Sequence, residues 1–295
     1  RSTLFPYTTL FRSSCAESVR MRPAMGTLLH VCATGRDAAA TDRAADAAVE
    51  AVARVDRLMS FHSTDSDLSR LNREAVHAPQ QVDPWTLAVL RRALRFSILS
   101  DGLFDITVAP LLVREGLLPQ LAASLPTGGS WRHLRVLPDG RVMFERPLWI
   151  DLGGIAKGFA VDMAIQVLRR ADCSAGSVNA GGDLRRYGAT SQTIHLRRSD
   201  GLIPIAELRC GAVATSGGGS EEPERLAVPL GRIVDPRDQS LRQGEDAVLV
   251  AARSCVVADA LAKVAALAGR ASEPLLARFG ARAYWDADRS RAGAR

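Results

Sequence analysis

Lysine is the residue that this sequence has least of. Of its 38 basic residues only two are lysines, Lys157 and Lys263, and the other 36 are arginines. An ammonium group is a compact point charge that a planar guanidinium does not replace. We therefore expect both lysines to be present for their chemistry, although chance survival is the alternative.

Several common site signatures are also missing. The five cysteines lie far apart with no CxxC, which argues against a disulfide framework or a zinc knuckle. The five histidines are scattered, and neither HExxH nor HxxxH occurs. Because GxxxxGK[ST] and GxGxxG are absent too, nothing supports a P-loop or a Rossmann site.

Long hydrophobic runs and a concentrated charge are absent as well. No apolar run approaches the roughly 18 residues that a membrane-spanning helix needs. With 47% hydrophobic and 24% charged residues, the 295-residue chain has the composition of a globular protein with a sizeable core. The net charge is +6, but the two ends contribute most of it, so a nucleic-acid-binding surface is not expected.

The two ends of the chain differ from the middle. Residues 1–13 (RSTLFPYTTLFRS) resemble a translated sequencing adaptor, which predicts that the true N-terminus is missing and that this segment packs against nothing. A genuine flexible leader is the alternative. We expect a linker over 14–20, one domain over 21–281 and a frayed tail over 282–295.

The middle of the chain has the pattern of an α+β domain. Hydrophobic periodicity and breakers predict helices over 42–59, 84–97, 155–170 and 257–268. Strands are expected at 25–33, 148–152, 193–198, 203–209 and 246–252. Helices and strands mix without a regular βαβ period, which favours a single domain built on a mixed or antiparallel sheet with packed helices.

The segment with the densest chemical signal is WIDLGGIAKGFAVD, residues 149–162. A buried strand ends at Asp151, two glycines follow, and a helix begins with Lys157 in its first turn. The free N–H groups of a helix start attract anions, and a lysine there adds a formal positive charge. This pattern predicts a phosphate or nucleotide pocket; an ordinary strand–turn–helix corner is the alternative.

Three further segments carry weaker signals. In SVNAGGDLRRYG a Gly-Gly pair precedes Asp183, which suits either a ligand-binding turn or a plain hairpin. In AVATSGGGS the hydroxyls of Thr215 and Ser216 could bind a phosphate, although such loops are usually only flexible. Asp259 and Lys263 are four residues apart in an apolar helix, so a local ion pair competes with any role at a site.

Taken together and in order, these segments resemble the ApbE-like FAD:protein FMN transferase family. The matching pieces are MGT, MSFHSTDSDLSRLN, SDGLFDITVAPL, DLGGIAKGFAVD, VNAGGDL, ATSG, IVDPR and ADALAKVAALAG. They span about residues 21–270, and DLGGIAKGFAVD is the most specific of them.

The resemblance implies a single α+β domain of ApbE-like, T-fold-like architecture. It implies a transferase that binds FAD with a divalent cation, usually Mg2+, moves the FMN half to a threonine hydroxyl of an acceptor flavoprotein, and releases AMP. It also suggests the outer face of the bacterial inner membrane, whereas the free cysteines weakly favour a reducing compartment.

The resemblance further implies roles for particular residues. Gly154, through its carbonyl, and Asp259 match the metal-binding positions, and we expect Lys157, Asp259 and Lys263 to form the catalytic set. The expected FAD-contacting residues, to which Thr215 and Ser216 are added from their own segment, are Met25, His62, Leu103, Phe104, Asp105, Asp151, Lys157, Thr215, Ser216 and Val234.

Two positions depart from the family pattern. Arg232 stands where many members have a histidine that is a candidate base, and a guanidinium cannot accept a proton. Lys263 stands where many members have a metal-binding threonine. We predict that Lys263 points into the same cleft as Lys157, pairs with Asp259 and either weakens the metal site or supplies positive charge itself. An FAD-binding homologue without transfer activity (a carrier, a sensor or a slow FAD pyrophosphatase) is the alternative function.

Overall fold

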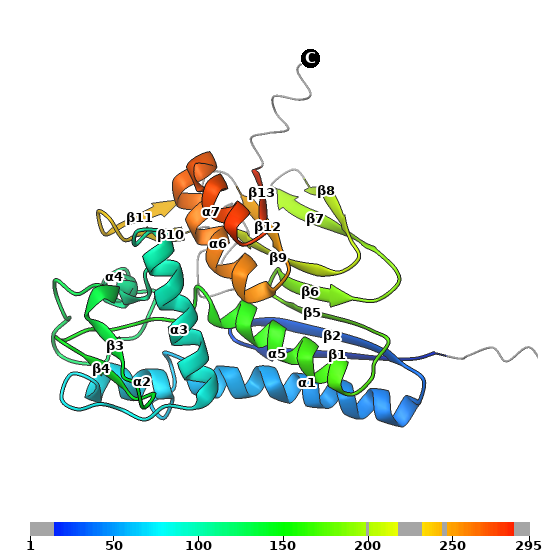
Figure 1. Cartoon of the computed structure of the whole chain (residues 1–295), viewed down its shortest axis with the longest axis horizontal. Helices are drawn as coiled ribbons and strands as arrows, with labels where there is room; N and C mark the ends of the chain where they lie inside the picture. The colour runs from blue at the N-terminus through cyan, green and yellow to red at the C-terminus, as the bar shows by residue number, and fades with distance from the viewer. Residues whose placement is uncertain (1–14, 199–200, 218–231, 244–246, 286–295) are drawn as a thin grey trace, which may run out of the picture.

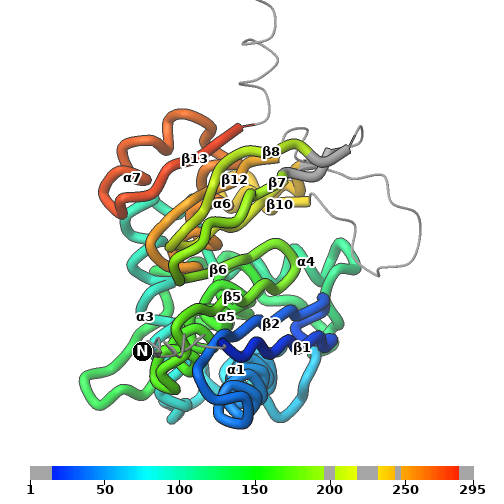
Figure 2. The backbone as a smooth tube through the Cα atoms, turned by 90° about the vertical axis from the view of Figure 1, so that its right-hand side faces the viewer, coloured from blue at the N-terminus to red at the C-terminus, as the bar shows by residue number. Residues whose placement is uncertain are grey.

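The chain folds around a seven-stranded sheet in which every neighbouring pair of strands is antiparallel. The structure, a computed structural model, describes residues 15–198, 201–217, 232–243 and 247–285. The strands are, in spatial order, β1 (Ala16–Ala24), β2 (Thr27–Gly35), β5 (Ala175–Ala180), β6 (Asp183–Tyr187), β9 (Gly211–Ser216), β12 (Val248–Ala252) and β13 (Arg282–Trp285). Figure 2 shows the β1–β2 hairpin at one end of this sheet and β12 and β13 toward the other.

Three helices pack on the sheet: α1 (Ala38–Met59), α5 (Ala156–Arg170) and α6 (Cys255–Ala268). Helix α1 lies against β1 and β2, α5 against β5 and β6, and α6 against β9 and β12 (Figure 1). The apolar residues of α1 recur every three or four positions, so one stripe of the helix is buried. This arrangement makes α5 the central helix, in contact with both α1 and α6.

A smaller group of elements lies beside the helices, at the left of Figure 1. It comprises α2 (Asp67–Glu74), α3 (Pro84–Leu99), η1 (Ile106–Val108), α4 (Ala109–Arg114), η2 (Trp131–His133), β3 (Leu134–Val136), β4 (Val142–Phe144), β10 (Arg232–Asp235) and β11 (Ser240–Gln243). The remaining elements are β7 (Gln192–Arg198), β8 (Gly201–Leu208), η3 (Gly269–Ser272) and α7 (Glu273–Arg278). The pairs β3–β4, β7–β8 and β10–β11 are separate antiparallel hairpins.

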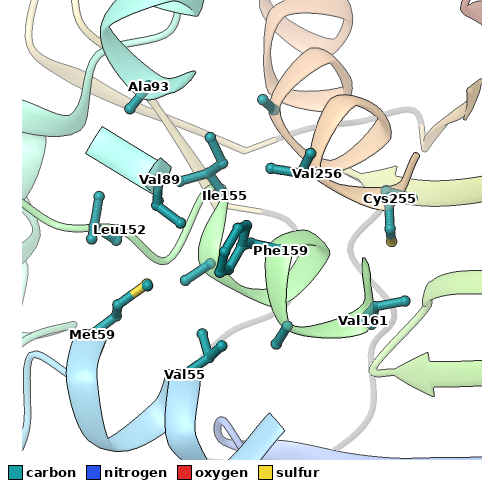
Figure 3. Packing of buried hydrophobic residues seen from close by; sticks show 14 of the residues in the cluster. Val55, Met59, Val89, Ala93, Leu152, Ile155, Phe159, Val161, Cys255 and Val256 are labelled. Carbon is teal, nitrogen blue, oxygen red and sulfur yellow. The ribbon is translucent and has the colours of Figure 1, made fainter. Parts of the chain in front are cut away.

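The core surrounds the first half of α5. Ile155 and Phe159 are almost completely buried, and Figure 3 shows them between residues of α1, α3 and α6. The neighbours labelled there include Val55, Met59, Val89, Ala93 and Val256. Burying one such side chain stabilises the fold by about 1.5–3 kcal/mol. The start of α5, where the sequence predicts a binding site, is therefore held from three sides.

Several predicted elements are confirmed. The helices expected over 42–59, 84–97, 155–170 and 257–268 correspond to α1, α3, α5 and α6, and the strands expected at 193–198, 203–209 and 246–252 correspond to β7, β8 and β12. The single α+β domain on an antiparallel sheet is confirmed as well.

The strand expected at 148–152 is wrong. This segment is buried, but it pairs with no strand. Instead the amide of Asn72 accepts a hydrogen bond from the Ile150 N–H at 2.8 Å and donates one to the Ile150 carbonyl at 3.0 Å. A side chain therefore satisfies the backbone groups that a neighbouring strand would otherwise satisfy.

The boundaries at both ends of the predicted domain also differ. Strand β1 begins at Ala16, inside the expected linker, and β13 occupies the first residues of the expected tail. Both segments add an edge strand to the sheet and are thus part of the domain. Residues 1–13, expected to pack against nothing, lie outside the described residues. Among the described residues no helix is long and apolar enough to cross a membrane.

Candidate active site

The first component of the candidate site is the start of helix α5. The two glycines at 153 and 154 lead into the helix, whose N-cap residue, Ile155, offers no side-chain cap. Two of the first N–H groups are nevertheless paired: that of Ala156 donates to the Leu152 carbonyl at 2.8 Å, and that of Gly158 donates to a carboxylate of α6. The turn and the helix that the sequence predicts for this segment are present, whereas the strand predicted before them is not.

Lys157, in the first turn of α5, pairs with Asp183 at the start of β6. Its Nζ lies 2.7 Å from Asp183 Oδ2, and the Asp183 side chain is almost completely buried. Burial by itself would lower the pKa of Lys157, but the charges of Asp183 and Asp259 outweigh burial and raise the pKa. The ammonium group therefore stays charged at neutral pH. Burial and then repulsion by Asp259 raise the pKa of Asp183, while Lys157 and Lys263 oppose that shift.

A second carboxylate, Asp259 of α6, lies next to this pair. Its Oδ2 accepts a hydrogen bond from the Gly158 N–H at 2.9 Å, and its Oδ1 accepts one from Lys263 Nζ. The predicted pairing of Lys263 with Asp259 is confirmed. Since the Asp259 side chain has no exposed surface, these partners replace the water that the carboxylate lost on folding.

Gly158 makes the close approach of α5 and α6 possible. A Cβ added to Gly158 would lie 2.5 Å from the Cys255 carbonyl oxygen and 2.7 Å from Asp259 Cβ. Both distances are shorter than any tolerable contact, so only glycine allows α6 to lie close enough for Asp259 to reach the α5 backbone.

Asp162 fixes the start of α6 in the same way. Its carboxylate accepts hydrogen bonds from the N–H groups of Cys255, at 2.8 Å, and Val256, at 3.0 Å, and pairs with Arg185 at 2.6 Å. These are the free N–H groups at the start of α6, so a side chain of one helix caps the next. Burial raises the pKa of Asp162, and the Arg185 charge opposes that shift.

Gly154 and Phe104 join the same cluster. A Cβ added to Gly154 would lie 3.6 Å from the Phe104 ring and 3.9 Å from Lys263 Cε. The side chain of Lys263 therefore extends from α6 toward the loop before α5, and its Nζ donates a hydrogen bond to the Asp259 carboxylate. The chain brings together Phe104, Gly154, Lys157, Asp259 and Lys263 from three separate segments.

A pocket contains two further predicted residues. It has a volume of about 210 Å³, and its lining includes Asp105, Trp149 and Val234. Asp105 directly follows Phe104 in the sequence, but the pocket lining includes neither Phe104 nor the residues around Gly154. Burial raises the pKa of Asp105, and hydrogen bonds from Thr107 oppose the shift.

Asp151 and His62 lie near each other at the edge of the site. Asp151 Oδ2 accepts a hydrogen bond from the Gly153 N–H at 3.0 Å. Burial raises the pKa of Asp151, and backbone N–H groups and the charge of His62 oppose that shift. His62 itself is exposed.

No recorded contact joins the other predicted residues to the cluster. Met25 forms the β1–β2 turn with a φ of 52°, and its N–H donates to Asp56 at 3.0 Å. Thr215 and Ser216 lie in β9, opposite Leu249 and Val248 of β12. Leu103 is a half-buried residue packed against the core. Their roles in FAD binding stay predictions.

Sequence reasoning missed two residues of the site, Asp183 and Asp162. The Gly-Gly-Asp pattern drew attention to Asp183, but its partner Lys157 is 26 residues away, and nothing local predicts that pairing. Asp162 lies in a segment whose pattern predicts only a helix, and the two N–H groups that donate to it are more than 90 residues away. The one signal in the sequence that could have found them is a carboxylate inside an otherwise apolar segment.

Comparisons with known proteins identify the architecture. A profile of the ApbE family matches residues 25–285. The chain belongs to the ApbE family. The "FAD:protein FMN transferase" of Vibrio cholerae is 27% identical over 268 residues, which cover 84% of this chain and 80% of the relative. That of Salmonella typhimurium is 27% identical over 252 residues, covering 76% and 71%.

A solved ApbE structure has the same fold. The ApbE protein of Thermotoga maritima superposes with a TM-score of 0.76 at 27% identity, covering 90% of this chain and 93% of that one. This ApbE chain therefore has the family fold over almost its whole length. Arg232, at the position expected to hold a histidine, is exposed at the start of β10.

Proposed function

We propose that this chain transfers the FMN part of FAD to a threonine hydroxyl of an acceptor flavoprotein and releases AMP. The observation that carries the proposal is the pair of lysine ammonium groups, Lys157 at the start of α5 and Lys263 on α6, in a chain of the ApbE family. The names of the relatives from Vibrio cholerae and Salmonella typhimurium support a transferase that uses FAD.

The reaction requires charge neutralisation more than covalent help from the protein. The threonine oxygen forms a bond to the phosphorus of the FMN half, and the bond from that phosphorus to the bridging oxygen breaks. AMP leaves with the bridging oxygen, and the hydroxyl proton passes to solvent. Positive groups that face the developing negative charge lower such a barrier.

The residues of the site suit this task. Lys157 stays protonated, so its ammonium group can keep the bond to Asp183 and donate its remaining hydrogens to a phosphate. The pocket whose lining includes Asp105, Trp149 and Val234 is the proposed place for the remainder of the FAD molecule.

The expected Mg2+ fits these residues poorly. Oxygen ligands suit Mg2+, but both carboxylates of the cluster, Asp183 and Asp259, are already paired with ammonium groups. In the described part of the chain, no group of three or more His, Cys, Asp or Glu residues could hold a metal ion. We therefore derive no step of the reaction through a resident metal.

One experiment tests the proposed reaction. Purified protein is mixed with FAD and an acceptor domain that bears a target threonine, and the mass of the acceptor is measured. We expect the acceptor to gain one FMN and AMP to appear in equal amount, whereas an acceptor with threonine replaced by valine gains nothing. Tight FAD binding without any mass gain would contradict transfer and favour the FAD-binding alternative.

The FAD site has a separate test. Lys157→Ala is expected to weaken FAD binding roughly tenfold or more, because a charge-assisted hydrogen bond contributes about 1.5–3 kcal/mol. Titration calorimetry measures this effect, with circular dichroism to check the fold. Unchanged affinity would remove Lys157 from the site.

A further inference from the structure

Lys263 contacts both residues that the family resemblance assigns to a metal ion. Its Nζ bonds to the Asp259 carboxylate, and its Cε lies 3.9 Å from the position that a Cβ on Gly154 would take. A divalent cation held by Asp259 and Gly154 would have to share this region with the ammonium group. The two cations exclude each other by volume and by charge.

The charge balance of the cluster leads to the same conclusion. Two carboxylates, Asp183 and Asp259, face two ammonium groups, Lys157 and Lys263, so the cluster is neutral as it stands. A divalent cation would have to displace one of these ammonium groups from its carboxylate. These pairs also include both lysines of the chain.

We propose that Lys263 Nζ takes the place of the divalent cation and that this chain binds the pyrophosphate of FAD without a resident metal ion. The inference rests on the proposed function, because it deepens the account of the same site. An ammonium group has three donors, so Lys263 can keep its bond to Asp259 and still donate to a phosphate oxygen. About a fifth of its side-chain surface is exposed, which leaves it accessible to a ligand.

A surface role for Lys263 explains the observations less well. Asp259 is completely buried, and among the described residues its other hydrogen-bond partner is the N–H of Gly158. Without Lys263 the chain would hold a buried carboxylate with one hydrogen bond, which is a strongly unfavourable state. Such an unpaired carboxylate is also what would attract a metal ion.

The test measures FAD affinity by titration calorimetry in excess EDTA and in excess Mg2+. It uses the wild-type chain, Lys263→Thr and Lys263→Arg, with Arg20→Gln as a control on the distant surface. We expect the wild type and Arg20→Gln to bind FAD equally well in both buffers. Lys263→Thr should lose about tenfold or more in EDTA and recover in Mg2+. Lys263→Arg keeps a cation and should not gain a dependence on Mg2+.

A second readout does not depend on FAD. Binding of Mn2+ alone, followed by electron paramagnetic resonance, should be absent in the wild type and present in Lys263→Thr. Thermal unfolding should show a stabilisation by Mg2+ for Lys263→Thr only, even if that variant is poorly folded without the ion.

The outcomes separate this inference from the proposed function. Wild-type FAD affinity that collapses in EDTA, or Mn2+ binding by the wild type, would overturn the inference while leaving the transferase intact. Failure to bind FAD in either buffer would instead overturn the proposed function. Metal-free FAD binding without transfer to the acceptor would overturn the transferase and leave the role of Lys263 standing.

Discussion

Two clusters of aspartates and cations in this protein contain the same kinds of charged groups, but one is exposed to water and the other is buried. At the surface, Arg20 of β1 bonds to Asp42 at 3.1 Å and to Asp46 at 2.6 Å on α1. In the site, Lys157 and Lys263 bond to Asp183 and Asp259. The surface aspartate side chains are 55% and 64% exposed, and those of the site are 1% and 0% exposed.

The difference shows which charges the fold depends on. Hydrogen bonds from Ser18 and Arg20 lower the pKa of Asp42, and one from Arg20 lowers the pKa of Asp46, since water still solvates both. In the site, burial raises the pKa of Asp183. A surface pair can be broken at little cost because water replaces the partner, whereas a buried carboxylate that loses its partner has nothing to replace it.

The largest expected effect is on the buried cluster. Lys157→Met should reduce the free energy of unfolding by about 3–5 kcal/mol, because Asp183 would stay buried without its cation. Urea denaturation followed by far-UV circular dichroism measures the change. The double variant Lys157→Met/Asp183→Asn should recover much of the loss. A loss below about 1 kcal/mol in the single variant would show that this pair matters no more for stability than an exposed ion pair.

A smaller effect is expected at the cap of α6. Asp162→Asn keeps an oxygen acceptor for one N–H but removes the charge that pairs with Arg185. The expected loss in free energy of unfolding is about 1–3 kcal/mol. Asp37→Asn is the matched control, because Asp37 caps the exposed start of α1 and asparagine is an equally good cap. Equal losses in the two variants would contradict the comparison.

The two clusters should also titrate in opposite directions from the usual pKa of 3.8 for an aspartate. The lowered pKa of Asp42 and Asp46 means that these groups stabilise the fold above about pH 3.8, and that this stabilisation is lost as the pH falls through their folded pKa. The raised pKa of Asp183 means that its destabilising effect at neutral pH is relieved as the pH falls through its folded value. Carbon-13 NMR of the carboxyl groups measures both shifts. A pKa of Asp183 lower than that of Asp42 would contradict this expectation.

The smallest effect is expected at the surface cluster itself. Arg20→Gln should leave the midpoint of urea unfolding unchanged within error, because all three groups of that cluster can be solvated by water. A shift as large as that of Asp162→Asn would show that β1 depends on this pair, and the contrast between the two clusters would disappear.

The sequence predicts the helices of this fold better than its strands. Helices α1, α3, α5 and α6 each have a local hydrophobic period, and α1 and α3 also begin at a local capping aspartate. The segment 148–152 has an apolar run typical of a buried strand. Its backbone partner is the side chain of Asn72, a residue 78 positions away that no local pattern connects to it.

The same distinction applies to the site. The pairing of Asp259 with Lys263 was predictable because a helix places residues four apart on one face. The pairing of Lys157 with Asp183 and the cap that Asp162 gives to α6 depend on how helices and strands pack, and the sequence alone does not determine either. The resemblance to the ApbE family indicated which segments meet, but not which charges would pair.

The contacts of Asp162 with residues 255 and 256 have a consequence for protein synthesis. Gly158 and Asp162 leave the ribosome early, but their partners on α6 are made about 90–100 residues later. Until then α5 has no neighbour on the side where Asp259 will bind. A nascent chain that stops before α6 therefore lacks Asp259 and Lys263 and holds only part of the buried cluster. The cluster is complete only after α6 has been translated.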